Sequence, residues 1–147
     1  MQKRILNKIS LLLASVLIAA TTLTLAGCAK NEVPAVNENV MVSVAGGEFG
    51  VGNTKFNFNV TDAEGNTTEF VVNTDETTVG DALLKVNLIA GEDSEYGLYV
   101  KTVNGVTADY DVDQTYWAFY INGEYAMTGV SDTNVEAGAT YEFKVEK

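Results

Sequence analysis

Two Asn-Gly dipeptides, each set between apolar runs, constrain the fold of this chain more than any other feature. Asn and Gly both accept the positive φ angles that the tightest hairpin turn requires, so Asn-Gly between apolar runs predicts a two-residue β-hairpin. The dipeptides are Asn104-Gly105, between residues 98–103 and 106–110, and Asn122-Gly123, between residues 116–121 and 124–127. We therefore expect a chain built mainly from antiparallel strands.

Alternation of polar and apolar residues predicts three further strands. Residues 55–60 alternate strictly, and the turn-forming residues 62–66 lead into a second apolar run at 68–72, which predicts another hairpin. The chain closes with a further alternating run over residues 140–146. In each strand the apolar side chains share one face, which we expect to be buried.

One segment, residues 77–86, has the periodicity of a helix. Its apolar residues recur at i, i+3, i+4 and i+7, and Thr78 precedes Asp81 by three residues, as in a capping box. The apolar residues are Val79, Ala82, Leu83 and Val86. A hairpin, one helix packed on a mixed sheet and then further hairpins is the element order of a β-grasp domain. We therefore predict the α+β class.

The first 27 residues have the pattern of a secretion signal. Basic residues precede an uncharged apolar stretch at 11–20, which Ser15 interrupts, so the segment is marginal as a permanent transmembrane helix of about 20 residues. It closes with Leu25-Ala26-Gly27-Cys28, which resembles the lipobox of bacterial lipoproteins. We predict cleavage before Cys28, lipidation of its thiol, and an extracytoplasmic protein anchored to the cell membrane. The alternative is an ordinary signal peptide followed by a chance free thiol.

The distribution of aromatic residues predicts where the folded domain begins. All six Phe, all seven Tyr and the single Trp lie at or after Phe49, whereas residues 29–39 have no periodic apolar pattern. We expect a flexible tether over residues 28–53 and one domain over residues 54–147. The alternating valines of residues 40–44 could instead add an edge strand.

Charge and composition exclude several classes of function. Twenty acidic against nine basic residues give a formal charge of −11, and so negative a surface repels phosphate backbones. The sequence has no histidine, which removes the usual general base of Ser and Cys hydrolases and the commonest metal ligand. We expect neither an enzyme nor a nucleic-acid-binding protein.

Three carboxylates alternate over residues 109–113 and would share one side of an extended segment, where they could bind calcium. A loop of the EF-hand type that begins at Asp109 needs Gly at its sixth position and Glu at its twelfth, where this sequence has Gln114 and Tyr120. We therefore expect a solvated acidic loop and predict no metal site.

The segment 116–130 holds the only tryptophan and a cluster of tyrosines. Alternation assigns its side chains to two faces: Trp117, Phe119 and Ile121 on one, and Tyr116, Ala118 and Tyr120 on the other. One face belongs to the core. Because a single helix cannot cover both faces, we expect the other to be partly exposed, and exposed aromatic clusters often mark binding surfaces. The alternative is that the tether or a loop at residues 91–97 covers it.

Several segments together resemble the transcobalamin-like C-terminal domain family. Its members are β-grasp modules that bind soluble ligands and also occur in bacterial surface lipoproteins. The segments are Thr74–Leu84, Gly97–Val100, Val103–Gly105 and, most specifically, Tyr116–Tyr125 followed by Gly129-Val130. The resemblance covers about residues 55–145. In that family this domain closes over cobalamin beside a helical α/α-barrel, which the 147 residues do not include.

The resemblance and the aromatic faces together predict a ligand site. The expected contact residues are Tyr116, Trp117, Tyr120, Met127, Gly129 and Val130, with the aromatic rings stacking on a flat, largely apolar ligand such as a corrinoid. No cofactor is required. The expected partners are a membrane, through the lipid anchor, and a membrane transporter or an α/α-barrel protein. The alternative function is an adhesive module whose aromatic face docks a protein or a glycan.

Overall fold

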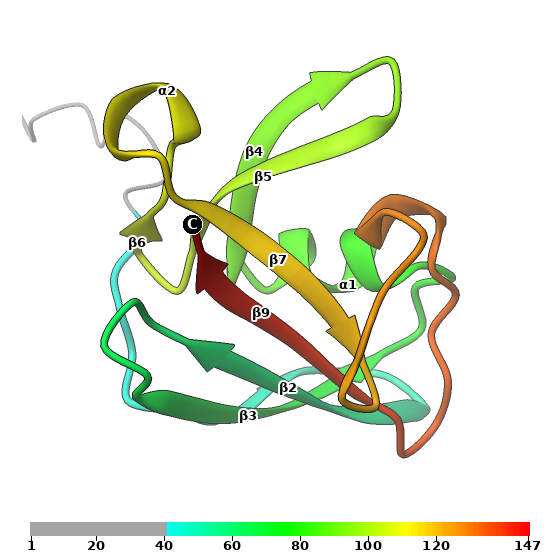
Figure 1. Cartoon of the computed structure of the whole chain (residues 1–147). Helices are drawn as coiled ribbons and strands as arrows, with labels where there is room; N and C mark the ends of the chain where they lie inside the picture. Colours follow the sequence, from blue (N-terminus) through cyan, green and yellow to red (C-terminus); the bar gives the residue numbers. More distant parts are fainter. Residues whose placement is uncertain (1–40) are drawn as a thin grey trace, which may run out of the picture. The chain divides into compact units, whose positions relative to one another are not determined.

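The structure, a computed structural model, describes residues 41–147 of the chain (Figure 1). In chain order its elements are β1 (Gly47–Gly50), β2 (Thr54–Thr61), β3 (Thr67–Thr74), α1 (Val79–Lys85), β4 (Ile89–Ser94), β5 (Gly97–Val103), β6 (Val106–Thr107), α2 (Tyr110–Asp113), β7 (Tyr116–Ile121), β8 (Glu124–Tyr125), η1 (Val130–Asp132) and β9 (Thr140–Glu146). The predicted signal peptide, Cys28 and the first part of the predicted tether lie outside the described residues.

Most of the strands form one mixed sheet. Its strand order is β1-β3-β2-β9-β7-β8, and a smaller sheet contains β4, β5 and β6. The β2–β3 and β7–β9 pairs are antiparallel, whereas β9 runs parallel to β2 in the centre of the sheet. The chain therefore belongs to the α+β class, and the predicted hairpin of residues 55–72 is confirmed.

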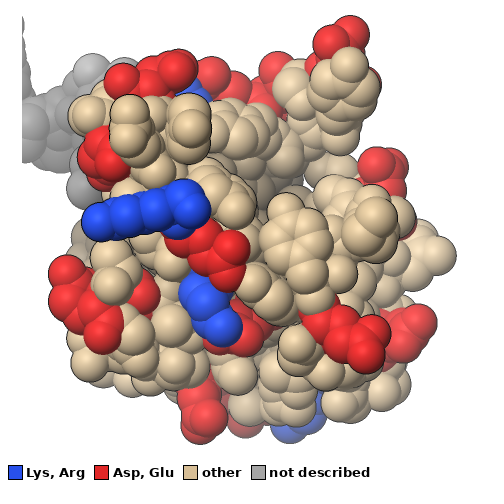
Figure 2. All heavy atoms as spheres, in the orientation of Figure 1, with Lys and Arg blue, Asp and Glu red and all other residues tan. Residues whose placement is uncertain are grey.

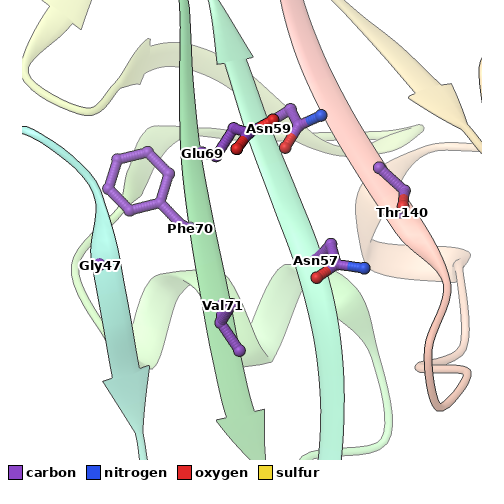
Figure 3. A pocket seen from close by; sticks show the side chains of 7 residues that line it. All are labelled: Gly47, Asn57, Asn59, Glu69, Phe70, Val71 and Thr140. Atoms are coloured by element: carbon purple, nitrogen blue, oxygen red, sulfur yellow. The ribbon is translucent and has the colours of Figure 1, made fainter.

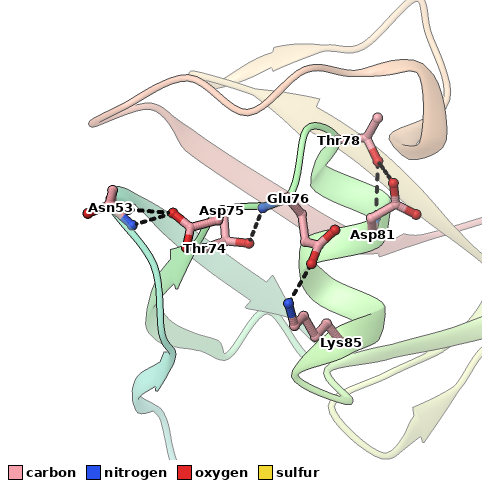
Figure 4. A network of polar contacts seen from close by, with 7 residues as sticks. All are labelled: Asn53, Thr74, Asp75, Glu76, Thr78, Asp81 and Lys85. Carbon is pink, nitrogen blue, oxygen red and sulfur yellow. Dashed lines mark hydrogen bonds and ion pairs between the residues drawn. The ribbon is translucent and has the colours of Figure 1, made fainter.

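The predicted helix is confirmed as α1, which packs against one face of the sheet (Figures 1 and 4). Its N-cap is Thr78, whose hydroxyl oxygen accepts a 3.1 Å hydrogen bond from the Asp81 backbone N–H and donates one of 2.8 Å to the Asp81 carboxylate. This pair satisfies a backbone donor at the start of the helix. No helix within residues 41–147 is long and apolar enough to cross a membrane.

The inward faces of the strands meet in an aromatic core. Phe56 packs edge-on against Tyr141 with ring centroids 5.2 Å apart, and the centroids of Phe119 and Phe143 are 5.0 Å apart. Each of these four side chains is buried. The period-two alternation therefore assigns the core faces of β2, β7 and β9 correctly.

Both Asn-Gly turns form as predicted, with φ angles of 47° and 76° at Asn104 and Gly105 and of 50° and 86° at Asn122 and Gly123. The returning strands β6 and β8 are each only two residues long. Residues 91–97, expected to form a loop, include most of β4. That strand escapes detection because every residue in it after Ile89 is exposed, which leaves no alternation to follow.

The acidic stretch at residues 109–113 is solvated, as expected, but it is not extended. Residues 110–113 instead form the helical turn α2, and the Asp109 carboxylate caps it by accepting a 3.1 Å hydrogen bond from the Asp111 backbone N–H. Aspartate commonly caps helix N-termini in this way. The three carboxylates therefore do not line one side of a strand.

Residues 41–53, here called the N-terminal strap, pack against the domain, although the sequence predicts a flexible tether there. Within the strap, β1 pairs in parallel with β3 and becomes the edge of the sheet. A Cβ at Gly52 would lie 2.0 Å from the backbone of Thr74, so only glycine permits this close approach. Residues 41–44 form no strand, which makes the alternative edge strand at residues 40–44 wrong over its described part.

Candidate functional site

A groove of about 380 Å³ lies along the free edge of β7, between β5 and residues 125–130. We call it the edge groove. Its lining residues are Leu98, Tyr99, Val100, Trp117, Phe119, Tyr125, Ala126, Met127, Thr128, Gly129, Val130 and Phe143. Segments that are about 30 residues apart in the sequence therefore build one hollow.

The edge groove is uncharged. None of the described residues that line it is Asp, Glu, Lys or Arg, although the chain contains 29 such residues, 20 acidic and 9 basic. Three lining side chains also present large exposed surfaces: Tyr99 is 41% exposed, Tyr125 is 55% exposed and Met127 is 94% exposed. An uncharged hollow with exposed aromatic and thioether side chains is typical of a ligand or partner site.

The backbone of β7 is open beside the edge groove. Strand β8 pairs only with Tyr120 and Ile121, after which the Ala126 N–H donates a 2.9 Å hydrogen bond to the Phe119 carbonyl. Backbone groups two residues apart along a strand point the same way, so the N–H and C=O of Trp117 also face away from β9. No strand within residues 41–147 pairs with Trp117 on that side.

The Trp117 side chain has an unused hydrogen-bond donor. It is 6% exposed, and its Nε1 is buried without an acceptor among residues 41–147. A buried donor without a partner costs about 1 to 3 kcal/mol. Trp117 thus contributes apolar surface to the groove while carrying a polar group that the protein itself does not satisfy.

The two walls of the edge groove are held together at one end. The Ser131 hydroxyl accepts a 3.3 Å hydrogen bond from the Leu98 backbone N–H, which joins η1 to β5. A Cβ at Gly129 would lie 3.7 Å from the Tyr96 carbonyl oxygen, so the turn before η1 lies against the tip of the β4–β5 hairpin. These contacts fix the distance between the walls.

Tyr116 and Tyr120 lie on the opposite face of the sheet from the core, where their hydroxyl groups both donate hydrogen bonds to the Glu146 carboxylate. The Lys144 ammonium lies 4.9 Å from the centre of the Tyr120 ring. The hydrogen bond to Glu146, followed by burial, raises the pKa of Tyr120 to about 12. Figure 2 shows charged groups of both signs over β9 beside uncharged surface over β7.

The structure therefore separates the predicted contact residues into two groups. Trp117, Met127, Gly129 and Val130 line the edge groove, and Val130 is buried within its wall. Tyr116 and Tyr120 are half-buried and do not line it. Alternation correctly places them away from Trp117, but it does not show that the groove opens at the strand edge rather than on a face.

Sequence reasoning missed the wall that β5 supplies. Leu98, Tyr99 and Val100 line the groove, as do Tyr125 and Ala126. Two signals were present: the Gly97–Val100 segment belongs to the family resemblance, and Tyr99 and Tyr125 are aromatic residues in short strands. Their proximity depends on the packing of β5 against β7, which no local pattern predicts.

A second hollow of about 390 Å³ lies on the outer face of the sheet, over β1, β3, β2 and β9 (Figure 3). Its lining is mostly polar: Gly47, Asn57, Asn59, Glu69, Phe70, Val71 and Thr140. The side chains of Asn57 and Asn59 project from β2 toward the viewer in Figure 3. Its lining includes a carboxylate, so it differs in chemistry from the uncharged edge groove.

The fold and the groove define a small α+β domain with an apolar hollow at the free edge of a strand. Residues 76–147 match the family described as "Domain of unknown function (DUF4430)". The structure is similar to that of a "putative metal binding protein" from Ruminococcus gnavus ATCC 29149, with 30% sequence identity and a TM-score of 0.61 over 65% of this chain and 98% of that one. The chain belongs to the same family as that protein.

A further similarity is to haptocorrin, solved in complex with Cbi, with 23% sequence identity and a TM-score of 0.49. It covers 67% of this chain and 26% of haptocorrin. No curated protein matches the sequence.

The described residues contain no cluster of candidate metal ligands. Within residues 41–147, no group of three or more His, Cys, Asp or Glu side chains is arranged to hold one. The sequence also lacks histidine, the commonest protein ligand of transition metals.

Proposed function

We propose that this chain is a membrane-anchored, extracytoplasmic ligand-binding lipoprotein, whose edge groove takes a flat, largely apolar ligand such as a corrinoid for uptake. The observation that carries the proposal is the uncharged groove at the free edge of β7 in a strongly acidic protein. Pockets that bind apolar ligands are lined mainly by apolar and aromatic side chains, with few polar groups among them. None of the described residues that line the groove is a carboxylate, a cysteine or a histidine, and we propose no enzymatic activity.

The strand order supports a β-grasp domain of the transcobalamin-like type. The β2–β3 hairpin is followed by α1, and the last strand, β9, enters the sheet parallel to β2. This arrangement brings β7 beside β9 and leaves the far edge of β7 covered by only two residues of β8. The proposed fold thus explains why a groove forms at that edge.

The size of the edge groove supports a ligand site that is shared with a second protein. Its volume of about 380 Å³ lies near the lower end of the range of about 300 to 1,000 Å³ found for ligand pockets. A corrin macrocycle would therefore contact the groove with part of its surface only. We propose that a second protein, either a membrane transporter or an α/α-barrel partner, covers the remainder.

The polar groups at the groove also suit a corrinoid. The backbone N–H and C=O of Trp117 have no strand partner on the groove side, and a carboxamide can accept from one and donate to the other. Corrinoids carry carboxamides around the macrocycle. This pairing would fix the orientation of a ligand that apolar contacts alone would leave free to rotate.

Titration with dicyanocobinamide, followed by its visible absorbance, tests the proposal. We expect the purified protein to bind, and Tyr99→Ala and Met127→Ala to weaken binding by about 1 to 2 kcal/mol each because both side chains are exposed groove contacts. Tyr110→Ala is the matched control, since Tyr110 is an exposed tyrosine on α2 outside the groove.

Two results would change this conclusion. No binding at high micromolar concentration would contradict the corrinoid proposal and favour the adhesive alternative. If Tyr116→Ala and Tyr120→Ala weaken binding while the groove variants do not, the ligand instead occupies the outer face of the sheet.

A further inference from the structure

Acidic side chains flank the β5 wall of the edge groove. Glu92 lies directly opposite Tyr99 in the β4–β5 ladder, and Asp93 lies opposite Leu98. Directly opposed residues in an antiparallel pair have Cβ atoms about 4.5 to 5.5 Å apart. Both acidic residues are exposed, so their charges lie beside the groove rather than in it.

The other wall is also acidic. Glu124 is exposed and lies opposite Ile121 in the β7–β8 ladder, on the face of β7 from which the lining residues Trp117 and Phe119 project. At the end of the groove where Ser131 joins η1 to β5, a Cβ at Gly97 would lie 4.0 Å from the Asp132 carboxylate, which is exposed as well. The uncharged groove is therefore bordered by carboxylates on both walls. We call Glu92, Asp93, Glu124 and Asp132 the acidic rim.

One cation near the β5 wall does not neutralise this rim. The Lys101 ammonium lies 5.9 Å from the centre of the Tyr99 ring. It is bound to Glu92 at 3.2 Å and to Asp109 at 3.4 Å, so its single charge is shared between two carboxylates. Both carboxylates raise the pKa of Lys101, which remains protonated at neutral pH.

We propose that the acidic rim makes the edge groove select flat macrocycles whose peripheral groups are neutral amides over the same macrocycles bearing carboxylates. This inference rests on the proposed ligand-binding function and adds to it a preference for uncharged ligands. An anionic ligand meets repulsion from both walls, and the apolar floor supplies no cation to compensate for lost hydration. A neutral amide meets neither penalty.

The geometry also requires the selection to depend on salt. The rim carboxylates are exposed, so their field is screened over about 10 Å at 0.1 M ionic strength and over about 3 Å at 1 M. Discrimination by the rim must therefore weaken as salt is added. Discrimination by shape or by hydrogen bonding to the β7 backbone would not.

The experiment compares dicyanocobinamide with dicyanocobyrinic acid, which has the same macrocycle with carboxylates in place of the amides. At about 0.02 M ionic strength we expect the acid to bind at least tenfold more weakly, and at about 0.5 M we expect the ratio to fall severalfold. The double variant Glu124→Gln, Asp132→Asn should lower the ratio at low salt. Glu64→Gln, in the exposed turn after β2, should leave it unchanged.

Each outcome bears on a different part of the account. Equal binding of both compounds at low salt would overturn charge selection and leave the proposed function standing. A ratio that neither salt nor the double variant changes would also overturn it, because the discrimination would not come from the rim. Failure of both compounds to bind would overturn the proposed function and this inference together.

Discussion

At the scale of single residues, Asn104 has two structural roles. It forms the β5–β6 turn with φ of 47°, and its buried side chain clamps the N-terminal strap. The Asn104 Oδ1 accepts from the Val44 N–H at 2.9 Å, and its Nδ2 donates to the Val44 carbonyl at 3.0 Å. The Asn-Gly pattern predicts the turn. The clamp involves a residue 60 positions away, so no local pattern predicts it.

We expect Asn104→Ala to lower the free energy of unfolding by about 2 to 4 kcal/mol, because it removes two partly buried hydrogen bonds and places alanine at positive φ. Asn122→Ala is the matched control: Asn122 has a φ of 50°, but it is exposed and makes one side-chain bond, to the Thr140 N–H. Urea denaturation of both variants measures the difference. Equal losses would show that the clamp contributes nothing beyond the turn.

At the scale of elements, the strands with a buried face were predictable and the others were not. Residues 55–60 and 140–146 alternate because one face of each strand is buried in the core. Strand β1 is short and glycine-bounded, with little buried surface, so its sequence carries no alternation. Its parallel pairing with β3 also joins residues about 23 positions apart. The sequence of the strap therefore predicts a tether.

We expect residues 54–147 alone to be less stable than residues 41–147. Removing the strap exposes the edge of β3 and the Phe70 ring, which Phe49 contacts with ring centroids 5.7 Å apart. Phe49→Ala in the longer chain should reproduce part of the loss, about 1 to 3 kcal/mol, since Phe49 is only half-buried. Thermal unfolding followed by circular dichroism tests this. Equal midpoints of thermal unfolding for the two lengths would show that the strap adds no stability and would support a tether that ends at residue 53.

At the scale of the whole molecule, the candidate site combines residues that sequence alone could not assemble. Trp117, Met127, Gly129 and Val130 were predicted together because they belong to the segment that resembles the transcobalamin-like family most specifically. Tyr99 joins them only because β5 packs beside the free edge of β7. Tyr116 and Tyr120 were predicted as contacts because alternation assigns them to the face of β7 away from the core; they do lie on that face, but they do not line the edge groove.

The proposed anchor makes a separate prediction for the intact protein in its cell. Replacing Cys28 with Ala should abolish metabolic labelling with a palmitate analogue, because the thiol is the proposed acceptor of the lipid. The variant should also leave the membrane fraction, while Gly27→Ala, which keeps a small residue before the cysteine, should remain labelled. Unchanged labelling of the Cys28 variant would contradict lipidation at this site.

The central claim is that the edge groove binds a flat apolar ligand, and backbone amide chemical shifts recorded during titration with dicyanocobinamide test it most directly. We predict that saturable shifts concentrate on residues 98–100 and 125–130, which form the two walls. The amides of Asn57 and Asn59, in the polar hollow on the outer face, should stay unchanged. Saturable shifts confined to the outer face, or no shifts at high micromolar ligand, would contradict the account.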